Sequence, residues 1–85
     1  MKFKIGTKFI NNIDHSKVPT KRYDHSINYT PFCSSPDKSL ETIGKIQTVI
    51  DIEDDCITTD FILSSGDNYW FERYSPYAYS CEKVK

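Results

Sequence analysis

Two alternating stretches, separated by a short acidic segment, most constrain how this chain folds. Residues 43–52 alternate with period two, which predicts a strand with one buried side, made of Ile46, Thr48, Ile50 and Ile52. Residues 56–63 resume the alternation, and their predicted inward set is Ile57, Thr59, Phe61 and Leu63. The sequence Glu-Asp-Asp at 53–55 suits a turn, so the two strands are predicted to pair as a hairpin.

A third strand is expected from Tyr69 to about Tyr74. The preceding residues, Ser-Ser-Gly-Asp-Asn at 64–68, accept turn conformations, and the three strands would form an antiparallel meander. Alternation puts Tyr69 and Phe71 on one face and Trp70 and Tyr74 on the other. We expect Phe71 and Tyr69 to be the core pair, because they continue the apolar face of the hairpin.

The amino-terminal residues 2–9 also alternate and predict a further strand, with Phe3, Ile5 and Phe9 as its apolar side. Residues 11–42 then form a long insertion. Within it, residues 23–33 suggest a short strand or a packed loop, and residues 35–41 allow at most one helical turn. No other helix is predicted. We therefore expect 85 residues to form one mainly β domain, an antiparallel barrel of about five strands.

Three short motifs resemble those of the small SH3-like barrels, including the KOW and Tudor-type modules. They are Lys-Ile-Gly-Thr-Lys-Phe at 4–9, Ile-Gly-Lys-Ile-Gln-Thr-Val at 43–49, and Gly-Asp-Asn-Tyr-Trp-Phe at 66–71. The resemblance covers about half the chain, and the insertion 11–42 departs from it. It implies that aromatics near the last turn line a ligand groove. The size and the tyrosine-rich composition also resemble a phage accessory protein.

Aromatic residues are concentrated between 66 and 80, and four of them are candidates for contact with a partner: Trp70, Tyr74, Tyr77 and Tyr79. Pro76 favours a turn, and in an extended segment Tyr77 and Tyr79 would point the same way, so Tyr77 is expected to be accessible. Exposed tyrosines suit both protein interfaces and base stacking. The alternatives are that residues 11–42 cover Trp70 and that residues 77–79 form an edge strand closing the barrel.

Charge is distributed unevenly along the chain. Residues 1–45 hold eight basic and four acidic side chains, and residues 46–85 hold three basic and eight acidic ones. The two halves either attract each other or form separate charged surfaces. A basic loop interleaved with aromatic and histidine side chains is a candidate nucleic-acid site, made of Lys17, Lys21, Arg22, Tyr23 and His25.

Several classes of protein are not favoured by the sequence. The chain is short for a catalytic cleft with its own supporting shell, so we expect no enzyme. The repeated Asp-His-Ser at 14–16 and 24–26 is compatible with a nucleophile or, with Cys33, a zinc site, but these residues are also ordinary turn formers. Neither a cofactor nor a metal is expected. The three cysteines lack metal or disulfide spacing, and no apolar run suits a membrane span or signal peptide.

The sequence therefore predicts a cytoplasmic, non-catalytic binding module, most simply a small inhibitor or regulator that binds another protein. A phage origin would place it in the host cytoplasm, with a host enzyme or defence factor as target. The alternative is a protein that binds RNA or single-stranded nucleic acid through the basic loop. A pI near 6.0 favours the protein partner.

Overall fold

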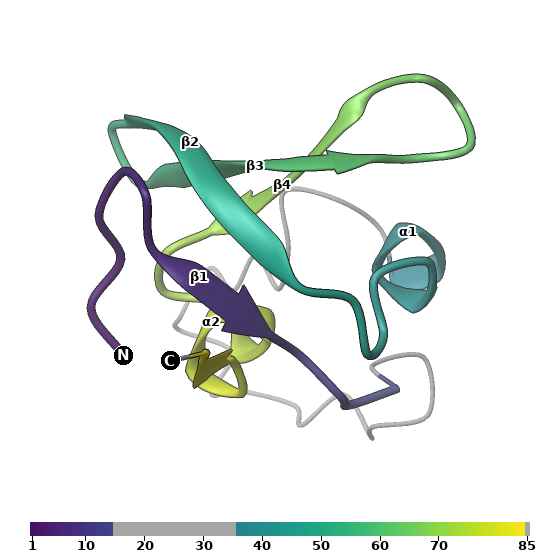
Figure 1. Cartoon of the computed structure of the whole chain (residues 1–85), viewed down its shortest axis with the longest axis horizontal. Coiled ribbons are helices and arrows are strands. Elements are labelled where there is room, and N and C mark those ends of the chain that lie inside the picture. The colour runs from purple at the N-terminus through teal and green to yellow at the C-terminus, as the bar shows by residue number, and fades with distance from the viewer. Residues whose placement is uncertain (15–35, 85) are drawn as a thin grey trace, which may run out of the picture.

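The computed structural model describes residues 1–14 and 36–84, which form one antiparallel sheet and two short helices (Figure 1). The strands are β1 (Lys8–Ile10), β2 (Gln47–Glu53), β3 (Cys56–Ile62), β4 (Asn68–Glu72) and β5 (Glu82–Lys83); the helices are α1 (Pro36–Leu40) and α2 (Pro76–Tyr79). The strand order is β4-β3-β2-β1-β5. Within the described residues no pairing joins β4 to β5, so the sheet is not closed. The prediction of a mainly β chain with about five strands is confirmed.

The central hairpin forms as predicted. Strands β2 and β3 pair from Val49 opposite Thr59 to Glu53 opposite Cys56, so Asp54 and Asp55 form the turn. Asp54 has a φ of 55°, a left-handed conformation that aspartate tolerates better than most residues. The predicted inward face of β3 is also confirmed, because Ile57, Thr59 and Leu63 are buried and Phe61 packs against the core.

The predicted inward face of β2 is wrong. Gln47 and Val49 are buried, whereas Ile46 and Ile50 are 59% and 45% exposed. The register shifts between Val49 and Asp51, and such a bulge exchanges the faces of the residues beyond it. Ile52 therefore packs against the core although Ile50 does not. Gln47 can occupy an inward position because its side-chain amide forms hydrogen bonds with the buried residues Thr59 and Tyr77.

The core is mainly aromatic. Phe3, Phe9 and Phe71 pack edge to face, with ring centroids 5.4 to 5.7 Å apart, and Tyr69 lies 6.0 Å from Phe71. The predictions for Phe3, Phe9, Tyr69 and Phe71 are thus confirmed. Ile5, predicted to be inward, is instead 68% exposed, because a turn at residues 5 and 6 interrupts the expected alternation.

Two helices flank the described sheet. Helix α1 has five residues, in agreement with the prediction of at most one turn between 35 and 41. Helix α2 contradicts the prediction that no other helix exists. It begins where Ser75, in an extended conformation, accepts a hydrogen bond from the amide of Ala78, and Pro76 follows in the first turn. Serine at the cap and proline at the first position are standard helix-start signals. The predicted structure for 23–33 lies outside the described residues.

Candidate functional site

A groove between the amino-terminal segment and the β4–α2 connection holds two of the predicted contact residues. It has a volume of about 230 Å³, and we call it the tyrosine groove; its lining residues are Met1, Lys2, Phe3, Arg73, Tyr74, Ala78 and Tyr79. Figure 1 shows the amino-terminal segment beside α2, which agrees with these lining residues. The groove thus joins residues that are more than seventy positions apart in the sequence.

Tyr74 and Tyr79 are both solvent-exposed, at 60% and 70% of their surface. Tyr74 lies two residues after the end of β4, and the hydroxyl of Ser75 donates to the carbonyl of Glu72 at 2.7 Å, which fixes the chain reversal between β4 and α2. Tyr79 ends α2 and faces solvent, because the helix turns Tyr77 and Ala78 toward the core instead. The short helix therefore places the second exposed tyrosine on the same groove as the first.

The prediction that Tyr77 is accessible is wrong, since only 1% of its surface is exposed. Its ring lies 4.9 Å from that of Phe71 and 5.2 Å from that of Tyr69, measured between centroids. An extended segment would have pointed Tyr77 and Tyr79 the same way, but helical geometry separates them. Burial raises the pKa of Tyr77 to about 12, although the hydrogen bonds that its hydroxyl makes with Thr42 and Gln47 act in the opposite direction.

The Tyr77 hydroxyl is part of a buried hydrogen-bonded chain across three elements. Thr59 donates to Oε1 of Gln47 at 2.9 Å, and Nε2 of Gln47 donates to Tyr77 at 2.8 Å. Thr42 donates to the carbonyl of Ser39 at 2.7 Å and lies 2.7 Å from the Tyr77 hydroxyl. Because a threonine hydroxyl has one proton, Tyr77 must be the donor to Thr42. Each side chain in this hydrogen-bond network has a partner, which explains how Gln47 and Thr42 can be fully buried.

Asn11 fixes the other side of α2. Its Nδ2 donates to the carbonyl of Tyr77 and to the hydroxyl of Ser80, both at 2.9 Å, and its Oδ1 accepts from the amide of Ile13 at 3.0 Å. Since Asn11 is 1% exposed, these bonds are shielded from water. The helix that presents Tyr79 is therefore held from two directions, by Asn11 and by the Tyr77 hydroxyl.

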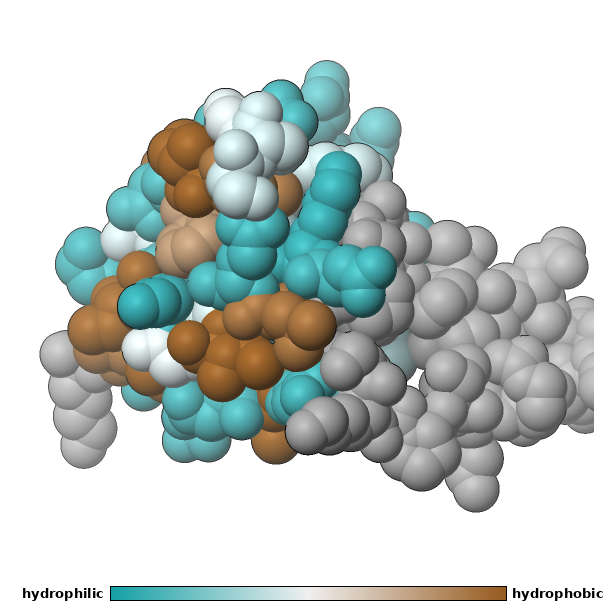
Figure 2. Space-filling model, turned by 90° about the vertical axis from the view of Figure 1, so that its right-hand side faces the viewer, coloured by the Kyte–Doolittle hydropathy of each residue, from teal (hydrophilic) through white to brown (hydrophobic). Residues whose placement is uncertain are grey.

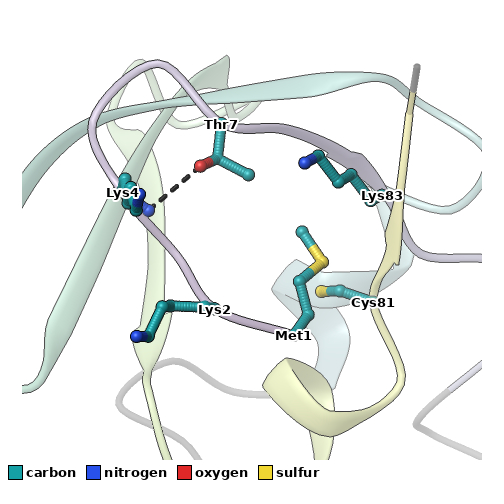
Figure 3. Close-up of a pocket in the computed structure, with 6 residues that line it drawn as sticks. All are labelled: Met1, Lys2, Lys4, Thr7, Cys81 and Lys83. Atoms are coloured by element: carbon teal, nitrogen blue, oxygen red, sulfur yellow. Dashed lines mark hydrogen bonds between the residues drawn. The ribbon is translucent and has the colours of Figure 1, made fainter.

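A second hollow adjoins the tyrosine groove and is strongly basic. This lysine cavity has a volume of about 460 Å³ and is lined by Met1, Lys2, Lys4, Thr7, Cys81 and Lys83. Figure 3 shows Lys4 and Lys83 on opposite sides of the hollow, with the Lys83 side chain extending toward Thr7. Burial raises the pKa of Cys81 to about 12, so its thiol is neutral at pH 7 and a poor nucleophile.

The remaining predicted site residues are Trp70 and the candidate nucleic-acid residues. Trp70 pairs opposite Thr58 in the sheet and is 37% exposed on the face away from Phe71, but it does not line the tyrosine groove. The predicted nucleic-acid residues, Lys17, Lys21, Arg22, Tyr23 and His25, lie outside the described residues, as do both histidines of the Asp-His-Ser repeats. Their proposed roles remain predictions.

Exposed apolar side chains also occur away from the tyrosine groove. Leu40 in α1 and Ile62 at the end of β3 are 38% and 55% exposed. Figure 2 shows the side of the molecule that lies to the right in Figure 1, where hydrophobic residues form several separate patches between hydrophilic ones. Because these patches are interrupted, we do not assign a site to this face.

Sequence reasoning missed the basic part of the site. Arg73, Lys2, Lys4 and Lys83 come from three distant segments, and only the pairing of β1 with β5 brings the chain ends together. The alternation of Lys2 and Lys4 with Phe3 was a usable signal, because it puts both lysines on the side opposite a core residue.

In residues 1–14 and 36–84, no group of three or more His, Cys, Asp or Glu side chains is arranged to hold a metal ion. Neither helix in these residues has the length and apolar character that crossing a bilayer requires. No family model matches the chain, and comparisons with curated proteins and with solved structures also gave no match.

Proposed function

We propose that this chain is a non-catalytic binding module of small SH3-like architecture that binds a protein partner through the tyrosine groove. The strand order and the short helix between β4 and β5 support the SH3-like part of this proposal. The observation that carries the functional part is the presence of two largely exposed tyrosine rings, Tyr74 and Tyr79, on one groove.

The stability of the folded protein does not explain why these two rings are exposed. The core already contains Phe3, Phe9, Phe71, Tyr69 and Tyr77, and burying a large aromatic side chain would stabilise so small a protein further. Tyrosine and arginine are the side chains that most often dominate protein interfaces, and Arg73 lines the same groove. A partner side chain entering the groove would cover both rings and remove them from water.

An inhibitory or regulatory role follows from size and composition. A chain of 85 residues can cover a functional surface of a larger protein without supplying chemistry of its own. The composition resembling a phage accessory protein supports a host protein as target, in the host cytoplasm. The acidic hairpin turn at 53–55 would supply an electrostatic rim that selects basic neighbours on the target.

Nucleic-acid binding is the second candidate, and one specific observation favours it. Exposed tyrosines beside lysine and arginine side chains are the combination that single-stranded nucleic acid requires, with rings for bases and cations for phosphates. The overall charge favours the protein partner, because a net charge of −1 gives no general attraction to a polyanion.

Affinity capture from the native cellular background tests the proposal. Immobilised wild-type protein should retain a protein partner in the presence of nuclease, and the double variant Tyr74→Ala, Tyr79→Ala should lose it. Loss of two interface anchors costs about 4 kcal/mol, which corresponds to roughly a thousandfold weaker binding. The double variant must melt near the wild-type temperature, as expected for exposed side chains.

Trp70→Ala is the matched control, because Trp70 is an exposed aromatic residue outside the groove. Capture should survive this substitution. Retention by the tyrosine double variant together with loss by Trp70→Ala would move the site to the outer face of β4. Loss of capture on nuclease treatment would favour the nucleic-acid candidate instead.

A further inference from the structure

The lysine cavity and the tyrosine groove adjoin each other, since Met1 and Lys2 line both. A partner segment lying in the groove would therefore contact Met1 and Lys2, which also line the cavity. The two hollows differ in chemistry: aromatic rings line the groove, whereas three lysine residues, Lys2, Lys4 and Lys83, line the cavity. The Lys83 side chain extends toward Thr7, and that of Lys2 points away from the hollow (Figure 3). What occupies the cavity can be inferred from its charge.

The charge of the cavity is set here by the described residues that line it. Among the described residues that line it, none is acidic, and none of the three lysines forms an ion pair with a described residue. The remaining ionisable side chain, the Cys81 thiol, stays protonated at pH 7 because burial disfavours its anion. Uncompensated cations around one hollow favour an anionic ligand.

The backbone that carries Lys4 is held in place. Its amide donates to Oγ1 of Thr7 at 3.0 Å, and the Thr7 amide returns a bond of 3.0 Å to the Lys4 carbonyl. This turn is joined to β2 through Gly6, whose amide donates to the carbonyl of Val49 at 2.8 Å, and through the Thr7 carbonyl, which accepts from Val49 at 2.9 Å. Gly6 has a φ of 95°, which only glycine adopts readily.

Lys83 is held from the opposite side of the cavity. It pairs with Phe9 in the sheet, and the amide of Val84 donates to the carbonyl of Lys8 at 3.0 Å. Lys8 itself is different, because its ammonium group donates to Thr48 at 3.0 Å and does not line the cavity. The sheet therefore fixes the positions from which Lys4 and Lys83 reach the hollow.

We propose that the partner segment bound in the tyrosine groove is an acidic peptide, and that the lysine cavity receives one of its carboxylate side chains. This inference rests on the proposed function. Separate lysine ammonium groups act as point charges and suit single carboxylates, and no arginine fork lines the cavity. A long polyanion would also meet the acidic excess of residues 46–85, whereas a short peptide could be confined to the groove and the adjoining basic hollow.

Amide chemical shifts of the whole chain, labelled with ¹⁵N, test this inference with synthetic peptides. The probes are a blocked peptide of alternating glutamate and leucine, its glutamine–leucine counterpart, and a short oligothymidylate. The glutamate peptide should shift signals of Lys4, Thr7 and Lys83 together with those of Tyr74 and Tyr79. The glutamine peptide should bind at least about tenfold more weakly, and added salt should weaken only the glutamate complex.

Charge removal supplies the second measurement. The double variant Lys4→Gln, Lys83→Gln should bind the glutamate peptide about tenfold or more weakly and lose the salt dependence. Lys45→Gln is the matched control, because Lys45 is an exposed lysine outside the cavity, and it should change neither quantity. All variants should keep the wild-type melting temperature within a few degrees.

The outcomes separate the inference from the proposed function. Equal binding of both peptides, or an unchanged double variant, would overturn the acidic-ligand inference while shifts at Tyr74 and Tyr79 would still support a groove for protein. Absence of shifts in both hollows would overturn the acidic-peptide inference, leaving the capture experiment to judge the function. If oligothymidylate binds more tightly than the glutamate peptide and through the same lysines, the ligand of the cavity is a nucleic acid and not an acidic peptide.

Discussion

Replacing Tyr77 with phenylalanine should destabilise the protein markedly, although only one oxygen atom is removed. The hydroxyl accepts from Gln47 and donates to Thr42, and all three residues are almost completely buried. The ring and its aromatic contacts remain, so the loss comes from the hydrogen bonds alone. The Gln47 amide would be left buried without this acceptor, which costs about 1 to 3 kcal/mol.

For a chain of this size, a loss of about 2 kcal/mol lowers the melting temperature by roughly 8 to 16 °C. Thermal unfolding followed by circular dichroism measures this shift. Tyr79→Phe is the matched control, because it removes an exposed hydroxyl from the same helix and should change stability by less than about 0.5 kcal/mol. Tyr77→Phe melting within a degree or two of wild type would refute the buried network.

A double-mutant cycle with Thr42→Val identifies the partner of the Tyr77 hydroxyl. If the two residues share a hydrogen bond, the double variant should lose less stability than the sum of the single variants, by about 0.5 kcal/mol or more. Strict additivity would show that the Tyr77 hydroxyl and Thr42 do not interact.

Three further predictions concern the core and its response to pH. Phe71→Ala should cost about 3 to 5 kcal/mol and Phe61→Ala less, since Phe61 is only partly buried; chemical denaturation measures both, and equal losses would contradict the burial pattern. Val49→Ala should lower the free energy of unfolding by more than about 1 kcal/mol and Ile46→Ala by less than about 0.5 kcal/mol. The reverse order would show that Ile46, as the sequence predicted, is on the buried face of β2. Because the folded pKa of Tyr77 is about 12 and its ordinary value 10.0, stability should fall as pH rises from 10 to 12. Tyr77→Phe should make this fall shallower, and an unchanged pH profile would contradict the assignment.

Period-two alternation predicted the faces of β3 and β4 correctly but failed for β2. In β4 the two faces differ in their partners, since Phe71 meets the core and Trp70 does not. In β2 isoleucine occupies the exposed face and Gln47 the buried one. A glutamine becomes a core residue only when Thr59 and Tyr77 meet its amide, and such long-range partners leave no local pattern in the sequence.

The candidate site was predicted in part for a related reason. Tyr74 and Tyr79 were identified from the density of aromatics, but Tyr77 was assigned to the wrong side because four residues are too few to show a helical period. Ser75 followed by Pro76 was the available signal, and it was interpreted as a turn rather than as a helix start. For the lysine cavity the alternation of Lys2 and Lys4 with Phe3 was a local signal, but Lys83 had none, because sheet pairing brings it to the amino-terminal segment.

Tyrosine iodination followed by mass spectrometry, on the free protein and on the protein bound to its captured partner, tests the assignment of the groove most directly. In the free protein, Tyr74 and Tyr79 should react readily, whereas Tyr77 should be protected by its burial. Binding of the partner should protect Tyr74 and Tyr79 as well. If both rings react as fast in the complex as in the free protein, or if Tyr77 reacts as fast as Tyr79 without a partner, the tyrosine groove is not the binding surface described above.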